Sequence, residues 1–344
     1  VGDGISMNLL MEDLDKAYRG EDIISEGDYS IFEFNLEVAA NNANGKRDSD
    51  LRYFDKFFEG VKLNRSILAK SKPEDLSKGV YGVIKKRFDR IPRKELIYYG
   101  KKYGVSENAM FIAAYNYMIS LFSDEDDVIS CSIHSGRIDS RYTNVVGALF
   151  QTYHSRYIKE PHEKVVDYIK KTGEQIMTTM KCVTPISRQG EMFFQFQGDI
   201  LEDPVIGGVQ TERVRAQLDS LPFHLQVMYD DKGYYIELRY WENRFDGEIL
   251  EIFLGCYEEV LRAILNEETS VRCLKHDIDD IYYPKHFYIE AARLNASLGR
   301  TLIPNAEDDE KIKVYVLDTD YNQIDSQLLD PTSETYEFKP DCIL

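Results

Sequence analysis

The sequence has 344 residues, 43% of them hydrophobic and 30% charged, which is typical of a folded globular protein and excludes a disordered chain. The net charge of −18 argues against nucleic-acid binding, which needs clustered lysines and arginines. No apolar run reaches the roughly 18 residues of a membrane helix, and the five cysteines are scattered without a C-x-x-C pair. We therefore expect a cytoplasmic protein with reduced thiols, no metal site and no contact with a membrane.

The first part of the chain predicts two helices joined by a polar linker. Apolar residues recur at helical spacing over residues 7–19, and Asp3 or Ser6 is placed to cap the start of this helix. The polar run over residues 39–50 is expected to be a loop. It leads into a second helix over residues 50–61.

The middle of the chain carries the clearest pattern. Residues 93–103 are typical of a helix, and Ser106 is placed to cap a longer apolar helix over residues 107–121. The segment "DVISCSI" follows as a short buried strand. A strand, two helices and a strand in this order indicate a layered α/β domain.

Strands and helices are also expected to alternate in the last part of the chain. A helix over residues 160–180 precedes a strand over residues 190–199. Residues 223–241 predict two strands joined by a D-K-G turn, and a helix follows over residues 247–266. After Ser270 the character of the sequence changes, and "KVYVLD" predicts a strand of a second unit.

Common motifs of catalysis and nucleotide binding do not occur in this sequence. It contains no Walker loop, no G-x-G-x-x-G, no G-x-S-x-G and no H-E-x-x-H. The six histidines are isolated from one another. His134 and His224 could line a cleft, although a histidine satisfied by its surroundings is the commoner case. The residues alone therefore indicate an α/β protein without a self-evident active site.

Several segments occur in the order typical of one enzyme family. Asp3-Gly4-Ile5-Ser6 is similar to the second half of the signature His-His-x-x-x-Asp-Gly-x-Ser, and "SGR" over residues 135–137 is similar to a family turn. "VGALFQTYHSR" over residues 146–156 resembles [IV]-G-x-F-V-N-T-x-x-x-R, with Gln151 in place of the Asn. Over residues 1–278 the chain thus resembles the condensation domains of nonribosomal peptide synthetases.

This resemblance implies a two-lobed α/β fold like that of chloramphenicol acetyltransferase, a sandwich of mixed sheets flanked by helices. Most of the N-terminal lobe, and the two signature histidines, would precede Val1, so the catalytic histidine is expected upstream of this chain. The segment "KCVTPIS" over residues 181–187 keeps only Pro185 of the next family motif, and the motif after it is mostly missing.

The implied activity is amide-bond formation between a donor acyl or peptidyl thioester and an acceptor aminoacyl group. Phosphopantetheine would tether both substrates to carrier proteins, and no cofactor would bind the chain directly. The implied partners are the upstream and downstream peptidyl carrier domains and an adjacent adenylation domain. Two alternatives stay open: an acyltransferase of the same superfamily that acts on a free alcohol or amine, and a catalytically idle module that docks carrier or adenylation domains.

The resemblance also implies roles for individual residues. Asp3 and Arg137 are expected to form a buried structural ion pair, with Gly4 close to the reaction site. Residues 146–156 are expected to form a central strand of the tunnel, with Arg156 facing solvent at its end. The residues expected to line the tunnel are Ser6, Ser135, Gly147, where the pantetheine arm would pass, and Gln151.

The C-terminal segment carries a second, shorter resemblance. "SLGRTLIPN" and "KVYVLDTDYNQ" resemble elements found late in adenylation domains of the same synthetases. Residues 279–344 are therefore expected to be a partial adenylation-like unit without ATP chemistry of its own. The alternative is a structural appendage whose similarity arises by chance.

Overall fold

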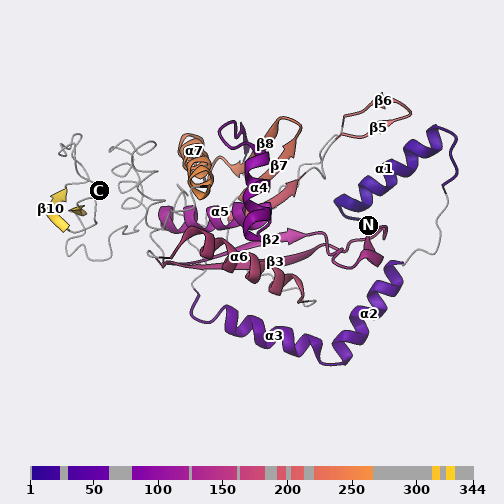
Figure 1. Ribbon diagram of the computed structural model, residues 1–344, viewed down its shortest axis with the longest axis horizontal. Coiled ribbons are helices and arrows are strands. Elements are labelled where there is room, and N and C mark those ends of the chain that lie inside the picture. The colour runs from indigo at the N-terminus through magenta and orange to yellow at the C-terminus, as the bar shows by residue number, and fades with distance from the viewer. Residues whose placement is uncertain are drawn as a thin grey trace.

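The computed structural model of the protein describes residues 2–23, 30–61, 80–123, 126–160, 163–182, 192–198, 203–212, 221–265, 312–317 and 323–329. Helices and strands are interspersed along this chain (Figure 1). The helices are α1 (Gly4–Tyr18), α2 (Ile31–Ala43), α3 (Lys46–Phe57), α4 (Arg93–Tyr103), α5 (Glu107–Ser123), α6 (Val165–Met180) and α7 (Gly247–Ile264). The strands are β1 (Tyr81–Arg87), β2 (Asp127–His134), β3 (Gln151–Ile158), β4 (Met192–Gly198), β5 (Val205–Ile206), β6 (Val209–Gln210), β7 (Phe223–Asp230), β8 (Gly233–Trp241), β9 (Ile312–Leu317) and β10 (Gln323–Leu329).

Strands β1, β8, β7 and β4 form, in this order, a mixed four-stranded sheet. Strands β1, β8 and β7 are antiparallel neighbours, and β4 runs parallel to β7. The D-K-G turn predicted from the sequence does join β7 to β8, and the last pair of the ladder is Asp230 with Gly233. Gly233 has a φ of 122°, a conformation that glycine adopts readily.

A second antiparallel pair, β2 with β3, lies beside β4 and extends the layer. Within the described part of the chain, β3 pairs with β2 alone, so it forms an edge of this layer. The prediction of a central strand over residues 146–156 is therefore wrong in two respects. The strand begins only at Gln151, because the residues before it are held by hydrogen bonds to α1, and it is not central.

Helix α5 forms the centre of the core. Its residues from Ala109 to Met118 are buried on every side except for slight exposure at Tyr117, because α5 packs between strands β2, β3 and β4 and helices α4, α6 and α7. Two buried tyrosines fix it to neighbouring helices: Tyr168 donates to the Ala113 carbonyl oxygen and Tyr257 to that of Phe111, each at 2.8 Å. A helix with apolar residues on all sides, here interrupted by Asn116, is expected in such a place.

Helix α3 packs on the face of the β2–β3 pair that points away from α5, where Phe54 and Phe58 contact the His154 ring (Figure 1). Phe54 and Phe58 also pack against Ile129 of β2. Neighbouring side chains on a strand point to opposite faces, so Ile129 points away from α5 while Val128 and Ser130 point towards it. The expected loop over residues 39–50 is instead mostly helical. A capping box between Ser30 and Glu33 starts α2, and the chain leaves the helical conformation only near Gly45, whose φ is 81°.

The C-terminal strands β9 and β10 form an antiparallel hairpin, which confirms the strand predicted at "KVYVLD". Three parts of the sequence predictions lie outside the described residues. They are the rest of the predicted unit 279–344, the end of the predicted condensation domain over residues 266–278, and most of the segment 181–187 that keeps only Pro185 of its family motif. In the described ranges, no helix combines the length and apolar character needed to cross a membrane.

Candidate functional site

Asp3 begins the site because it caps the first helix. It has extended backbone angles, and its carboxylate Oδ1 accepts hydrogen bonds from the backbone N–H of Ser6 at 2.9 Å and from the Ser6 hydroxyl at 2.8 Å. An N-cap aspartate satisfies a helix N–H that has no partner within the helix. The cap therefore fixes the carboxylate at the start of α1.

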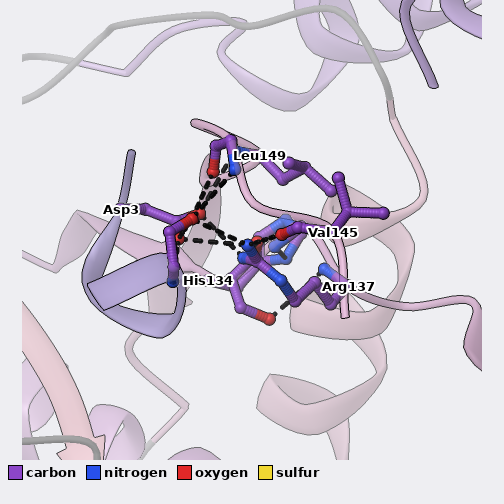
Figure 2. A network of polar contacts seen from close by, with 9 residues as sticks. Asp3, His134, Arg137, Val145 and Leu149 are labelled. Atoms are coloured by element: carbon purple, nitrogen blue, oxygen red, sulfur yellow. Dashed lines mark hydrogen bonds and ion pairs between the residues drawn. The ribbon is translucent and has the colours of Figure 1, made fainter. Parts of the chain in front are cut away.

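Arg137 meets this carboxylate from the turn that follows β2 (Figure 2). Its Nη1 lies 2.7 Å from Asp3 Oδ2 and its Nη2 lies 3.1 Å from Oδ1, which is the two-pronged geometry typical of strong arginine–carboxylate pairs. Nη2 also donates to the Val145 carbonyl oxygen at 2.7 Å. The side chains are only 4% and 7% exposed, so the expected buried ion pair is present.

The Asp3 carboxylate is ionised in this setting. Burial acts to raise its pKa, but the hydrogen bonds from Arg137 and Ser6 outweigh burial, and the pKa of Asp3 is lowered from 3.8. Its Oδ2 also accepts from the backbone N–H of Leu149 at 3.1 Å. A carboxylate whose oxygens are all occupied, and whose pKa is lowered, is poorly suited to accept a proton from a substrate.

Ser6 links the same cap to Gly147. Its hydroxyl accepts from the Gly147 N–H at 3.0 Å and lies 2.9 Å from the Gly147 carbonyl oxygen, which competes with Asp3 Oδ1 for the one hydroxyl proton. Gly147 is buried, and a Cβ atom there would lie 2.6 Å from Ile31 Cδ1. The structure therefore gives Gly147 a packing role between α1 and α2, and its use as a passage for a pantetheine arm stays a prediction.

Gly136 allows the turn that presents Arg137. Its φ is 72°, and a Cβ atom there would lie only 1.8 Å from the Leu149 carbonyl oxygen. Both the left-handed conformation and the close approach of the two backbones require glycine. The turn and the segment from Val145 to Leu149 are thus fitted closely against each other.

The remaining predicted site residues lie around this network. Gly4 is the exposed first residue of α1. Ser135 is half-buried, and its hydroxyl accepts from the Arg137 N–H at 3.3 Å. Gln151 is half-buried at the start of β3, directly opposite His134. The structure brings these residues to one end of the β2–β3 pair, next to the start of α1.

Arg156 does not face solvent as expected. Its guanidinium forms a two-pronged pair with Asp127, at 2.8 and 2.7 Å, and donates to the carbonyl oxygens of Phe57 at 2.7 Å and Glu59 at 3.1 Å. The end of α3 supplies these carbonyl groups because helix ends leave them without helical partners. Arg156 therefore anchors α3 to the edge strand.

His134 and His224 are both largely buried and neutral. Burial lowers the pKa of each from 6.5 to about 4, and nearby Arg239 adds to the effect at His224. His224 Nε2 lies 3.0 Å from Gln195 Oε1, so it is satisfied within the sheet. His134 lies beside the Asp3–Arg137 pair (Figure 2).

Sequence reasoning missed the backbone partners of this network. The Val145 carbonyl and the Leu149 N–H carry no signal in the identity of their side chains, and only the three-dimensional fold brings them to Arg137 and Asp3. In the described ranges, no three His, Cys, Asp or Glu side chains gather closely enough to hold a metal ion. The arrangement can hold the start of α1 rigidly in place.

Comparisons with known families agree with this architecture. A sequence model of the family described as "Condensation domain" matches residues 1–183. A second model, "FkbH, N-terminal domain", matches residues 291–344. The prediction of an adenylation-like C-terminal unit is therefore wrong: short strand-and-turn patterns of this kind are shared by unrelated families. A comparison with curated protein sequences found no match.

Solved structures share the fold at low sequence identity. The chain is similar to the condensation domain of the monacolin K polyketide synthase MokA, with a TM-score of 0.63 and 14% identity over 79% of this chain and 69% of that one. It is similar to the EpoB cyclization-docking bidomain from Sorangium cellulosum, with a TM-score of 0.64 and 15% identity over 78% of this chain and 59% of that one.

A four-domain nonribosomal peptide synthetase, solved with AMP and glycine, is also similar, with a TM-score of 0.61 and 14% identity over 79% of this chain. The chain spans 23% of that protein's length. These likenesses show the expected fold, mixed α/β with mixed sheets flanked by helices, as in chloramphenicol acetyltransferase. Because the family model covers more than half of its residues, the chain belongs to the condensation domain family.

Proposed function

We propose that this chain is part of a nonribosomal peptide synthetase condensation domain that forms an amide bond between two carrier-bound substrates. The observation that carries the proposal is the buried Asp3–Arg137 pair, which fixes the residues directly after the position of the expected histidine signature. A chain held this firmly can present a preceding side chain to a substrate in one orientation.

The proposed reaction is an acyl transfer. The amine nitrogen of the acceptor attacks the carbonyl carbon of the donor thioester, and the C–N bond forms as the C–S bond breaks. The amine proton passes to the sulfur of the departing pantetheine thiol. Positioning the amine close to the carbonyl supplies several kcal/mol of the rate enhancement, and a neutral imidazole is suited to move the proton.

In this proposal Asp3 and Arg137 support the reaction without taking part in it. The Asp3 oxygens are occupied by Arg137, Ser6 and the Leu149 N–H. The proton acceptor is instead the second signature histidine, expected upstream of Val1. Gly4, at the exposed start of α1, leaves room for the substrate next to that histidine. Ser135 and Gln151 are both half-buried nearby, and in this proposal they contact the phosphopantetheine arms of the donor and the acceptor.

The proposed partners are peptidyl carrier domains upstream and downstream, and the proposed setting is the cytoplasm. Phosphopantetheine reaches the site as part of each carrier, so the chain itself needs no bound cofactor. An adjacent adenylation domain is also proposed, although the C-terminal segment does not supply it, since residues 291–344 match the FkbH N-terminal domain.

The test is transfer between carriers by the full protein. The donor carrier is loaded with an acyl thioester and the acceptor carrier with an amino acid, and the mass of each pantetheine-bound product is measured. A control reaction uses an acceptor carrier that is loaded with a hydroxy acid in place of the amino acid. A third reaction replaces the acceptor carrier with a free amine or alcohol. Transfer to the carrier-bound amine supports the proposal.

The other outcomes separate the alternatives. Transfer to the free amine or alcohol alone would identify an acyltransferase of the same superfamily. No transfer to any acceptor, with carriers still bound, would identify a docking module. An adenylation unit at the C-terminus would have favoured amide formation over the alternatives. Residues 291–344 match the FkbH N-terminal domain instead, so the choice between the three activities depends on this experiment.

A further inference from the structure

His134 is the last residue of β2 and lies three positions before Arg137. It shares a face of the strand with Ser130 and Ser132, because side chains alternate along a strand. On that face Ser130 contacts Ser155, which accepts a hydrogen bond from Asn116 of α5. His134 is therefore on the same face of β2 as these buried polar groups, at the end of the strand that leads into the turn with Arg137.

The hydrogen bond at Nδ1 decides which ring nitrogen carries the proton. The backbone N–H of Gly136 donates to His134 Nδ1 at 3.1 Å. A nitrogen that accepts this bond has no proton of its own, so the neutral ring carries its proton on Nε2. With a pKa lowered by burial to about 4, the ring keeps this neutral form throughout the physiological range.

The Nε2–H group is buried and has no hydrogen-bond partner among the described residues. The ring of Tyr153 is an aromatic neighbour, with its centroid 5.9 Å away. The hydroxyl of Tyr153 is already engaged with Asn108, which donates to it at 2.8 Å and accepts from it at 3.1 Å. Because a buried donor without a partner destabilises a fold, such a group calls for an explanation.

We infer that the Nε2–H of His134 donates a hydrogen bond to a carbonyl oxygen of the acyl-pantetheine substrate, and that His134 is a substrate-binding residue of the condensation site. The inference rests on the proposed function. Three observations support it: the ring is held by Gly136, its free donor is buried, and it lies beside the pair that orders the start of α1 (Figure 2).

An uncharged donor suits this ligand. The thioester and amide groups of an acylated pantetheine arm are neutral and offer carbonyl oxygens as acceptors. A charged imidazolium would be costly to bury beside Arg137, whereas a neutral N–H is not. Binding needs only a small outward movement of the ring or its neighbours, because the side chain as a whole is half-buried.

The variant His134→Asn tests the inference sharply. The asparagine side-chain oxygen can accept from the N–H two residues later, as in an Asx turn, and so replaces Nδ1 while the Nε2 donor is lost. We expect this variant to lose about tenfold in kcat/KM for the loaded donor carrier, as for loss of one hydrogen bond, with its unfolding temperature unchanged. The matched control is His224→Asn, which removes a buried histidine satisfied by Gln195 and should lower the unfolding temperature without this kinetic loss.

A binding measurement separates this inference from the proposed function. The chain is labelled with ¹⁵N-histidine, and the Nε2–H resonance of His134 is followed as S-acetylpantetheine is added. A downfield shift that is absent in His134→Asn supports the inference, even if the full protein forms no amide and the proposed function fails. An unmoved resonance at saturating probe, or full kcat/KM in His134→Asn, overturns the inference while amide formation by the wild type stands.

Discussion

Asp3 and Arg137 lie 134 positions apart in the sequence, yet two guanidinium nitrogens meet both oxygens of one carboxylate at 2.7 and 3.1 Å. Each partner also holds a separate segment. Asp3 caps α1 through Ser6, and Arg137 holds the chain at Val145. The pair therefore joins three parts of the chain that the sequence keeps apart, and it does so where water is excluded.

Loss of this pair should destabilise the fold. We expect Asp3→Ala to lower the free energy of unfolding by about 3–5 kcal/mol, because Arg137 would stay buried without its counter-charge. Chemical denaturation of both proteins measures the difference. The matched control is Asp13→Ala, which breaks a 3.2 Å pair with Lys16 on the same helix where both side chains are 42% exposed. This surface pair is worth less than about 1 kcal/mol, and equal losses in the two variants would contradict the structural role of Asp3.

Two glycines with nearly the same backbone angle allow strain to be separated from steric overlap. Gly20 has a φ of 73° and no atom within 4 Å of the position that a Cβ would take, whereas a Cβ at Gly136, with a φ of 72°, would lie 1.8 Å from the Leu149 carbonyl oxygen. Gly20→Ala should lower stability by about 1–2 kcal/mol through the left-handed conformation alone. Gly136→Ala should lower it clearly further, and thermal unfolding that ranks the two variants in the opposite order would refute the close approach of the two backbones.

Stability should fall as the solution becomes mildly acidic. The pKa values of His134 and His224 are about 4 in the folded protein and 6.5 ordinarily. Between these values the unfolded chain binds protons that the folded chain does not, so the free energy of unfolding decreases as the pH falls from 6.5 towards 4. The loss is on the order of 3 kcal/mol for each histidine at the lower end.

Urea denaturation at pH 7, 6 and 5 measures this dependence. The double variant His134→Asn, His224→Asn should show a flatter profile over the same interval, since it lacks both groups. Below pH 3.8 the lowered pKa of Asp3 adds a further loss as its carboxylate becomes protonated. An unchanged slope in the double variant would show that neither histidine is buried in its neutral form.

The anchor between α3 and the edge strand can be tested by changing Arg156 to lysine. A lysine keeps the charge next to Asp127 but cannot also reach the Phe57 and Glu59 carbonyl oxygens in the planar geometry of arginine. We expect a loss of about 1–2 kcal/mol in the free energy of unfolding and faster proteolysis within α3. Lys159→Ala is the control, because its pair with Asp126 is exposed; a similar effect of both changes would argue against the anchor.

The ion pair could be predicted from sequence because a buried carboxylate needs a partner and the family resemblance supplied Arg137. The central helix and the hairpin at the D-K-G turn were also predictable, since an apolar run of that length and a glycine turn have few alternatives. These features depend on local chemistry or on a recognised motif, and both are visible in a single sequence.

Other features depend on contacts that a single sequence does not show. The asparagine-rich run at the end of α2 favours a loop locally, yet it stays helical almost to the break at Gly45, because α2 is capped at its start and α3 is held by Arg156. Besides their carboxylate partners, Arg156 and Arg137 donate to backbone carbonyl groups, which every residue carries. Their positions follow only from the fold.

The measurement that tests the account most directly is single-turnover amide formation between two loaded carriers by the full protein, with the unfolding temperature of each variant recorded alongside. If two histidines precede Val1, replacing the second by alanine should slow the reaction by roughly 10²–10⁴-fold and leave the unfolding temperature nearly unchanged. Asp3→Ala should lower both the rate and the unfolding temperature. A fully active histidine variant beside a stable but inactive Asp3→Ala would contradict the assigned roles, and a wild type that forms no amide would contradict the proposed function itself.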